Sequence, residues 1–248
     1  MTFDDQRLKK DGDLGMPQYP ASPEPDDFRK FCDSPERFKY IRYANEIRPY
    51  DPMVIRSLNK LKRVPLGLQE IVAKEGDHIV FFNGRITDFP EFEYLKGVML
   101  GGLNWGTYGD VDGVYNPTSG GIFVKISSNE DTILHEFGHS FDNAIGKYIC
   151  FSIRMGGLDL FNKPLSSKKS VLRAIKNEPF VSWGSDLSNP KEYVAHAFQL
   201  FYSSDESRKQ LEEKNPTIFQ LLSKIESLVN KEELKKPINI IGTFRAIS

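Results

Sequence analysis

Apolar and polar positions alternate along the chain at two spacings, one typical of helices and one typical of strands. From Pro25 to Gly76 the apolar residues recur at helical spacing, and proline, serine or aspartate precedes most of the segments. This pattern predicts helices, and one core face is expected to carry Phe38, Ile41, Ala44 and Ile47. The run DHIVFFNG then predicts a buried strand that ends at a turn formed by Asn83 and Gly84.

Two longer helices are predicted in the second half of the chain. The stretch from Leu95 to Gly121 is rich in glycine, and the run GIFVKIS after it predicts a strand. An apolar stripe then runs through TILHEFGHSFDNAIG, with candidate caps at residues 127–129 and a natural stop at Gly146. The second helix covers Ser188–Tyr202, and two more helices follow it. The expected fold class is therefore α+β and mostly helical.

The first of these helices contains one match to the pattern H-E-x-x-H. His135 and His139 are four positions apart, so in a helix both imidazoles project from one face and can hold the same zinc ion. Glu136 then stands beside the water on the metal, where it can act as a general base. The same spacing also occurs in helices with two exposed histidines and no metal, so a third ligand decides between the two interpretations.

Two other residues of this helix bear on the site. Asp142 lies on the same helix face as His139 and is a candidate to hold a ligand imidazole from behind. Gly138 costs roughly 1 kcal/mol against alanine inside a helix, so its presence predicts close approach of another backbone or of a ligand.

The candidate third ligand lies in the second helix, in the run SNPKEYVAHAFQLFY. Glu192 and His196 are one turn apart there and share a face. Catalytic zinc takes three protein ligands and keeps one position open, whereas a structural site is closed by four. A closed structural site is therefore the disfavoured alternative, unless His196 supplies a fourth ligand.

Taken together, the runs TILHEFGHSFDNAIG and NPKEYVAHAFQLFYSSDESRKQLEEKNPTIFQLL resemble the catalytic domain shared by anthrax lethal factor and the clostridial Pro-Pro endopeptidases. The upstream runs HIVFFNGRITDFPEFEYLKGV and GDVDGVYNPTSGGIFVKIS are also similar to that family. The resemblance spans roughly residues 58–229. It implies a zincin-like metallopeptidase fold with a small sheet beside the zinc helix.

Carried over residue by residue, the resemblance makes His135, His139 and Glu192 the Zn²⁺ ligands and Glu136 the general base. The family usually has a tyrosine before the third-ligand helix that stabilises the oxyanion, and here Trp183 takes its place. An indole N–H can donate a hydrogen bond but exchanges no proton at neutral pH, which implies weaker transition-state stabilisation. The family tends to have glutamate where this chain has His196, which either orients a ligand imidazole or is a buried polar residue.

Substrate binding is expected beside the metal. In zincins a strand next to the zinc pairs with an extended peptide through main-chain hydrogen bonds, and here that role is expected of Gly121, Ile122, Phe123 and Val124. Three aromatic residues of the glycine-rich segment either line the cleft or belong to the core, namely Trp105, Tyr108 and Tyr115.

Composition limits the other possibilities. The chain has 248 residues, of which 39% are hydrophobic and 27% charged, and its formal net charge is −1. These values indicate a soluble globular protein of one or two domains and give no support for nucleic acid or an anionic membrane as its main partner. The two cysteines, Cys32 and Cys150, exclude a disulfide framework and match no zinc ribbon.

The N-terminal residues bear on localisation. Residues 1–24 are polar and proline-rich, which predicts an extended arm without the apolar core of a secretory signal peptide. No apolar run in the sequence is long enough to span a membrane. The family resemblance favours a secreted protein and the missing signal peptide favours a cytoplasmic one, so both stay open. The sequence indicates no oligomeric state.

The expected organisation is an arm at 1–24, a helical extension at 25–54 and a lethal-factor-like zincin domain at 55–248. The expected function is that of a zinc endopeptidase, which hydrolyses peptide bonds in an extended protein or peptide. The alternative is a catalytically weak zinc-binding domain that binds extended peptides without cutting them.

Overall fold

The computed structural model describes several stretches of the chain. The chain forms two units, and all the described stretches belong to the second. The chain divides into Met1–Asp33 and Ser34–Ser248. The described residues all lie in the second unit and are 41–44, 47, 51–97, 99–100, 103–104, 111–152, 164–180 and 189–230. The predicted arm at 1–24 lies outside the described residues, as does most of the predicted extension at 25–54.

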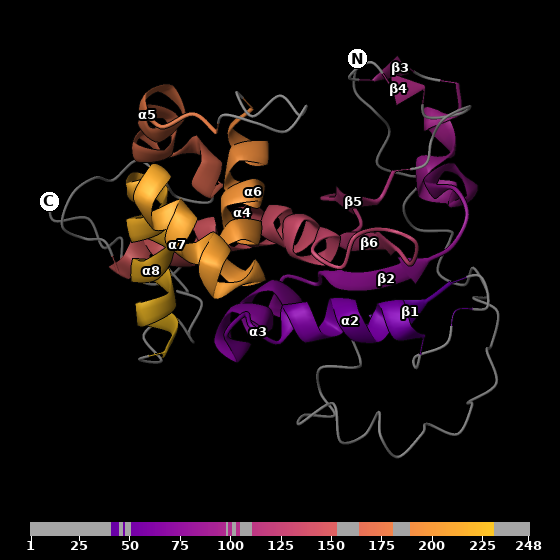
Figure 1. The fold of residues 1–248 in the computed structure, drawn as a ribbon. Coiled ribbons are helices and arrows are strands. Elements are labelled where there is room, and N and C mark those ends of the chain that lie inside the picture. The colour runs from indigo at the N-terminus through magenta and orange to yellow at the C-terminus, as the bar shows by residue number, and fades with distance from the viewer. Residues whose placement is uncertain are drawn as a thin grey trace, which may run out of the picture. The chain divides into compact units, whose positions relative to one another are not determined.

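A four-stranded sheet forms one part of the unit (Figure 1). Its strands are β1 (Ile41–Tyr43), β2 (His78–Phe82), β5 (Gly113–Asn116) and β6 (Gly121–Lys125), in the order β1-β2-β6-β5. The pairs β1–β2 and β2–β6 are parallel, whereas β5 runs antiparallel to β6. Strand β6 is therefore paired on both sides, and β5 forms one edge of the sheet. Strands β3 (Met99–Leu100) and β4 (Leu103–Asn104) form a separate antiparallel pair.

Strand β1 corrects one prediction from the sequence. The helical spacing through Phe38–Ile47 predicted a helix, but Ile41–Tyr43 is a strand in register with Ile79–Phe81 of β2. The main-chain N–H of Ala44 continues the pairing by donating to the carbonyl of Phe81. Pairing with a neighbouring strand has overridden a short periodic signal, which is a known weakness of such patterns.

The helices follow the sequence prediction closely. Helices α2 (Pro52–Leu61), α3 (Leu66–Lys74), α4 (Thr132–Ser152) and α5 (Lys169–Asn177) are followed by α6 (Pro190–Ser203), α7 (Asp205–Lys214) and α8 (Pro216–Asn230). The cap of α6 is as predicted, because the Asn189 side chain accepts from the Lys191 N–H and Pro190 opens the first turn. The predicted stop at Gly146 is wrong, since α4 continues to Ser152.

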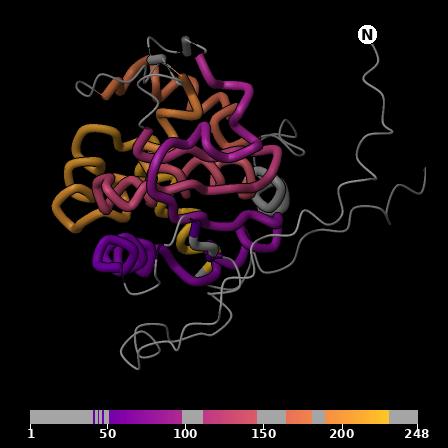
Figure 2. The backbone as a smooth tube through the Cα atoms, turned by 90° about the vertical axis from the view of Figure 1, so that its right-hand side faces the viewer, coloured from indigo at the N-terminus to yellow at the C-terminus, as the bar shows by residue number. Residues whose placement is uncertain are grey.

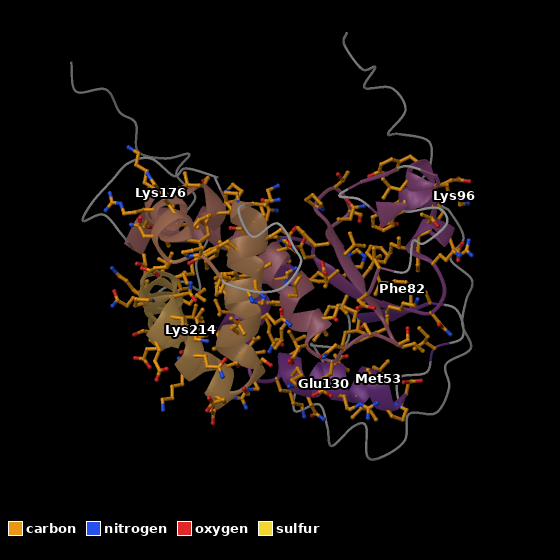
Figure 3. The ribbon with its side chains drawn as sticks, turned by 45° about the horizontal axis from the view of Figure 1, so that its top comes forward. Met53, Phe82, Lys96, Glu130, Lys176 and Lys214 are labelled. Atoms are coloured by element: carbon orange, nitrogen blue, oxygen red, sulfur yellow. The ribbon has the colours of Figure 1, made fainter. Side chains whose placement is uncertain are left out.

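The two faces of the sheet are covered by different elements. Helix α4 packs against β5 and β6, where Ile122 and Val124 are fully buried. The opposite face is covered by the 3-10 turns η3 (Ile86–Asp88) and η4 (Pro90–Leu95). Its core cluster consists of Val80, Phe82, Ile86, Phe92, Leu95 and Phe123. Figure 3 labels Phe82 in this cluster, and Figure 2 views the unit from the side of the sheet.

Helix α4 makes its most extensive packing against α6, and a glycine permits it. A Cβ atom on Gly138 would lie 2.9 Å from the Ala195 Cα and 3.0 Å from the Ala195 carbonyl oxygen. The predicted close approach to Gly138 is thus confirmed, and the approaching group is backbone. Beside it, the rings of Phe141 and Phe198 pack against each other with centroids 4.8 Å apart and planes tilted by 39°.

The start of α4 is tied to α2 by charge. The Lys60 ammonium lies 2.9 Å from an Asp131 carboxylate oxygen and 3.3 Å from one of Glu130. Figure 3 labels Glu130 close to α2. This pairing holds the two acidic residues at the N-terminal end of α4, where they also suit the helix dipole.

Candidate metal centre

Three side chains from α4 and α6 converge on one point. His135 and His139 lie four residues apart on α4 and face Glu192 in the first turn of α6. The Glu192 carboxylate oxygens lie 3.3 Å from His135 Nε2 and 3.5 Å from His139 Nε2. One donor atom from each of the three residues lies within 4.8 Å of the others, so a single ion can contact all three.

The Glu192 carboxyl is ionised without a bound metal. Hydrogen bonds from His135 and His139 lower the pKa of this carboxyl far below its ordinary value, although partial burial opposes them. The carboxylate is therefore ionised at neutral pH. Two imidazole nitrogens and one carboxylate oxygen form a ligand set that suits zinc and leaves a further coordination position open. The residues thus fit the ion that the motif implies.

Glu136 stands beside the three ligands and is almost fully buried, at 7% exposure. Burial raises the pKa of its carboxyl to about 7, and the nearby Glu192 charge adds to the effect, whereas His135 and the main chain of Tyr115 oppose it. The main-chain N–H of Tyr115 donates a hydrogen bond to this carboxylate. A carboxyl that titrates near neutrality can both take and return a proton.

Gly113 is a site residue that the sequence analysis did not single out. A Cβ atom at this position would lie 2.6 Å from Glu136 Cγ and 2.8 Å from Thr132 Cγ2. Because Gly113 has no side chain, β5 leaves room for the Glu136 side chain. The signal was present in the sequence as the glycine-rich stretch, but nothing in that composition marks one glycine above the others.

A cavity of about 350 Å³ opens over these residues. The three ligand residues and Glu136 line it together with parts of β5 and of the start of α6. The other lining residues are Gly113, Val114, Tyr115, Pro117, Asp142, Asn143, Pro164 and Lys191. Tyr115, one of the three aromatic residues considered for the cleft, is thus placed in it. Trp105 and Tyr108 lie outside the described residues.

Asp142 lines this cavity and is buried, at 2% exposure. Its two carboxylate oxygens accept hydrogen bonds from the main-chain N–H of Ser166 at 2.6 Å and from the Ser166 hydroxyl at 2.7 Å. Burial raises the pKa of the Asp142 carboxyl, whereas these two hydrogen bonds and the nearby His139 oppose the rise. The direct partner of Asp142 is therefore Ser166, and its effect on His139 acts through charge.

His196 does not join the group of donor atoms. Among the described residues, only His135, His139 and Glu192 gather closely enough to hold one ion. The His196 ring packs edge-on against Phe180, with centroids 4.8 Å apart. Burial lowers its pKa, and the neighbouring His135 adds to the decrease. This placement disfavours the closed four-ligand site and leaves His196 beside the site rather than in it.

The sheet order corrects the expected peptide platform. Gly121, Ile122, Phe123 and Val124 belong to β6, whose two sides are occupied by β2 and β5. All four residues are buried. A peptide therefore finds no free main-chain edge on β6, and the edge strand beside Glu136 is β5, whose outer side pairs with no other strand among the described residues. Trp183, predicted at the oxyanion position, lies outside the described residues.

Comparison with known proteins places this arrangement in context. The family described as anthrax toxin lethal factor, N- and C-terminal domain, matches residues 50–225. A protein named Pro-Pro endopeptidase from Paenibacillus alvei is 27% identical over 176 residues, which cover 67% of this chain and 74% of that protein. A solved structure of the Pro-Pro endopeptidase from Paenibacillus alvei superimposes with a TM-score of 0.59 at 22% identity. The superposition covers 76% of this chain and 98% of the chain in the solved structure.

Proposed function

The chain belongs to the anthrax toxin lethal factor family, and from that premise we propose that it is a zinc-dependent endopeptidase acting on extended peptide segments. The observation that carries the proposal is the convergence of His135, His139 and Glu192 beside the buried carboxyl of Glu136. Three ligands with an open position and an adjacent base are the parts that metal-assisted hydrolysis needs. The name of the bacterial relative supports peptide bonds as the substrate.

Each residue has a defined task in this proposal. When bound, zinc lowers the pKa of a coordinated water toward neutrality and polarises the substrate carbonyl. His135, His139 and Glu192 hold the ion and fix its orientation. Glu136 takes the proton from the attacking water and later delivers it to the leaving amine, for which a pKa near 7 is suited.

The edge strand β5 is the proposed platform for the peptide. Lys125 N–H donates to the Asp112 carbonyl across the β5–β6 pair, so the main-chain groups of β5 point alternately toward β6 and toward its free edge. The Tyr115 N–H reaches Glu136 and therefore lies on the free side. An extended peptide can add to this edge and pass over the ligand residues. This assignment replaces the one made for β6.

Peptides with consecutive prolines are the first substrates to test. The bacterial relative is named for such a sequence. In this chain, Pro117, Pro164 and the ring of Tyr115 line the cavity. Apolar and aromatic surfaces of this kind suit the rigid rings of proline.

The decisive experiment combines zinc analysis with cleavage of a peptide library that includes Pro-Pro sequences. The purified protein is expected to hold one zinc per chain and to cut a defined set of peptides. Glu136→Gln is expected to keep the zinc and to lose cleavage, because an amide cannot accept the proton. Glu212→Gln, an exposed change on α7, serves as the matched control and is expected to cleave normally.

Other outcomes separate the competing interpretations. Full zinc occupancy without cleavage of any peptide points to the alternative, a domain that binds extended peptides without cutting them. Substantial hydrolysis by Glu136→Gln would refute the role of Glu136. A protein that binds no zinc overturns the proposal altogether.

A further inference from the structure

A buried polar cluster joins the edge strand β5 to α4 behind the site. Asp77 precedes β2 and is 5% exposed. One of its carboxylate oxygens accepts a hydrogen bond from the Tyr115 hydroxyl at 3.2 Å and another from the Ser140 hydroxyl. Asn143 donates to the Tyr115 hydroxyl oxygen at 3.4 Å. The cluster therefore links the start of β2, strand β5 and two successive turns of α4.

The backbone closes tightly around this cluster. Gly120 has a φ of +71°, and a Cβ atom there would lie 2.6 Å from an Asp77 carboxylate oxygen. Only glycine fits that turn without displacing the carboxylate. Burial raises the pKa of the Tyr115 phenol well above its ordinary value, and the adjacent Asp77 charge adds to the rise, so the phenol stays protonated and remains a donor.

Tyr115 joins this cluster to the side chain of the proposed general base. Its hydroxyl binds Asp77, while its main-chain N–H donates to the Glu136 carboxylate. Glu136, Ser140 and Asn143 recur at helical spacing on α4, so they form the side of the helix that faces β5. Strand β5 is thus held against α4 at two places, at Glu136 and at the cluster around Asp77.

We propose that Tyr115 is a positioning residue, whose hydroxyl, held by Asp77 and Asn143, fixes β5 against α4 and thereby orients Glu136. The proposal rests on the peptidase function proposed above, because a catalytic rate is one of its readouts. Without the hydroxyl, the ring can remain in the cavity wall while β5 gains freedom. Glu136 then loses its fixed N–H partner although the three ligand residues are unchanged.

The test is Tyr115→Phe, which removes one oxygen. We expect kcat to fall by about tenfold or more, with KM altered far less and zinc content unchanged. Amide hydrogen exchange in β5 is expected to accelerate, and this second readout needs no substrate. Tyr202→Phe is the matched control, because it removes a buried phenol that interacts with Glu226 near the end of α6 opposite to Glu192. The control is expected to keep both the wild-type kcat and slow exchange in β5.

Asp77→Asn provides an independent route to the same result. Because both variants break the same link, the double variant is expected to lose little more kcat than Tyr115→Phe alone. Wild-type kcat and wild-type exchange in Tyr115→Phe would overturn the inference. A wild-type protein that cleaves no peptide contradicts the peptidase function instead, and the exchange data still decide whether Tyr115 fixes β5.

A second inference comes from the charge at the mouth of the cavity. Lys191 lines the cavity beside Glu192 and is the only lysine or arginine among its described lining residues. The main-chain N–H of Lys191 donates to the Asn189 side chain. Among the described residues, no ion pair joins the Lys191 ammonium group to a carboxylate. Of the nearby acids, Asp142 binds Ser166 and interacts with the Lys191 charge without forming an ion pair, and Glu192 faces the two histidines.

We infer that Lys191 binds a carboxylate of the substrate, so peptides with an acidic group close to the scissile bond are preferred. The group is either an aspartate or glutamate side chain or a free C-terminus, and both present the same charge. This inference also rests on the proposed peptidase function. It requires only that a peptide in the cavity passes within reach of the Lys191 side chain.

Binding to Glu136→Gln tests this without turnover. Matched fluorescent peptides carry glutamate, glutamine or lysine near the cleavage position, each with a free or an amidated C-terminus. We expect Lys191→Ala to weaken binding of the acidic peptides by about fivefold and to leave the neutral ones unchanged. Lys191→Glu is expected to favour the lysine peptide, whereas Lys214→Glu, at the end of α7 (labelled in Figure 3) and not among the cavity-lining residues, serves as the control.

The two carboxylate sources give different patterns. If amidation alone removes the effect of Lys191, the bound group is the C-terminus. If the side-chain change removes it, the group lies inside the peptide. Equal loss for neutral and acidic peptides, or no loss for either, overturns the inference. Failure of wild type to cleave peptides that Glu136→Gln binds contradicts the catalytic proposal and leaves this one standing.

Discussion

The two sides of α4 serve one site but are built in different ways. On the side of α6, aromatic rings and the close backbone approach at Gly138 bring the ligand residues together. On the side of β5, a short edge strand, Gly113 and a polar cluster around Asp77 hold Glu136. The α6 side resembles an ordinary apolar core, whereas the β5 side depends on individual polar contacts. Metal binding and catalysis are therefore expected to fail separately when one side is changed.

The largest effect is expected on the α6 side, from removal of a ligand. His139→Ala leaves two donors for the ion, so zinc affinity is expected to fall by more than about a hundredfold, beyond the loss typical for residues that only support a ligand. Cleavage is expected to disappear with the metal. Competition with a chelating dye measures the affinity. His78→Ala, at the start of β2 and outside the cavity, is the control and is expected to bind zinc normally.

The next largest effect is the pH dependence of stability that Glu136, on the β5 side, gives to the metal-free protein. Burial raises the pKa of Glu136 from 4.5 to about 7, so between these pH values the folded state holds a proton that the unfolded state has released. Raising the pH through this window therefore destabilises the metal-free protein, by at most about 3 kcal/mol. Glu136→Gln cannot ionise and is expected to be the more stable form at pH 8.

Urea unfolding of both metal-free proteins at pH 5 and pH 8 measures this difference. The gap in the free energy of unfolding should widen toward pH 8. A constant gap at both pH values argues that Glu136 is not buried as described.

A smaller effect is expected from Gly113→Ala, which also acts on the β5 side alone. The new methyl group meets Glu136 Cγ at 2.6 Å, so the Glu136 side chain must move while the ligands stay. We expect kcat to fall by about a hundredfold, as for a misplaced catalytic group, with zinc content unchanged. Steady-state kinetics with metal analysis on the same sample checks both. Loss of zinc in parallel with kcat contradicts the separation of the two sides.

The smallest effect is expected from Gly138→Ala on the α6 side. Its methyl group meets the backbone of Ala195 at 2.9 Å, so α4 and α6 must separate slightly. Overpacking of this kind typically costs 1–3 kcal/mol, and the better helix propensity of alanine returns about 1 kcal/mol. A net loss of up to about 2 kcal/mol is expected in urea unfolding, together with weaker zinc binding. Unchanged zinc affinity indicates that the ligand geometry tolerates this shift.

The α6 side was the easier one to predict from the sequence. The periodicity of α4 and α6 is long, and the H-E-x-x-H spacing with Glu192 follows from helix geometry alone. Strands β2 and β6 were also found, because continuous apolar runs with flanking turn residues mark buried strands. Within the described residues, no helix is both long and apolar enough to cross a membrane.

The β5 side was missed because its information is not local. Strand β5 is a four-residue segment that begins with glycine, and nothing in it indicates which strand it pairs with. The order β1-β2-β6-β5 brings distant segments together, so the peptide platform was predicted on β6, which β2 and β5 flank on both sides. Asp77 and Tyr115 are 38 residues apart, and only the sheet makes them neighbours. The predicted domain start at residue 55 stays a prediction.

The placement of both ligand histidines and the base on one helix also limits how such a protein can change over generations. Each residue added to a helix turns everything beyond it by about 100°. An insertion or deletion between His135 and His139 therefore breaks the site at once, whereas connecting segments can lengthen or shorten without moving it. Families of this kind are expected to diversify by exchanging loops around an α4 of constant register, so new specificities can arise while the hydrolytic centre is inherited intact.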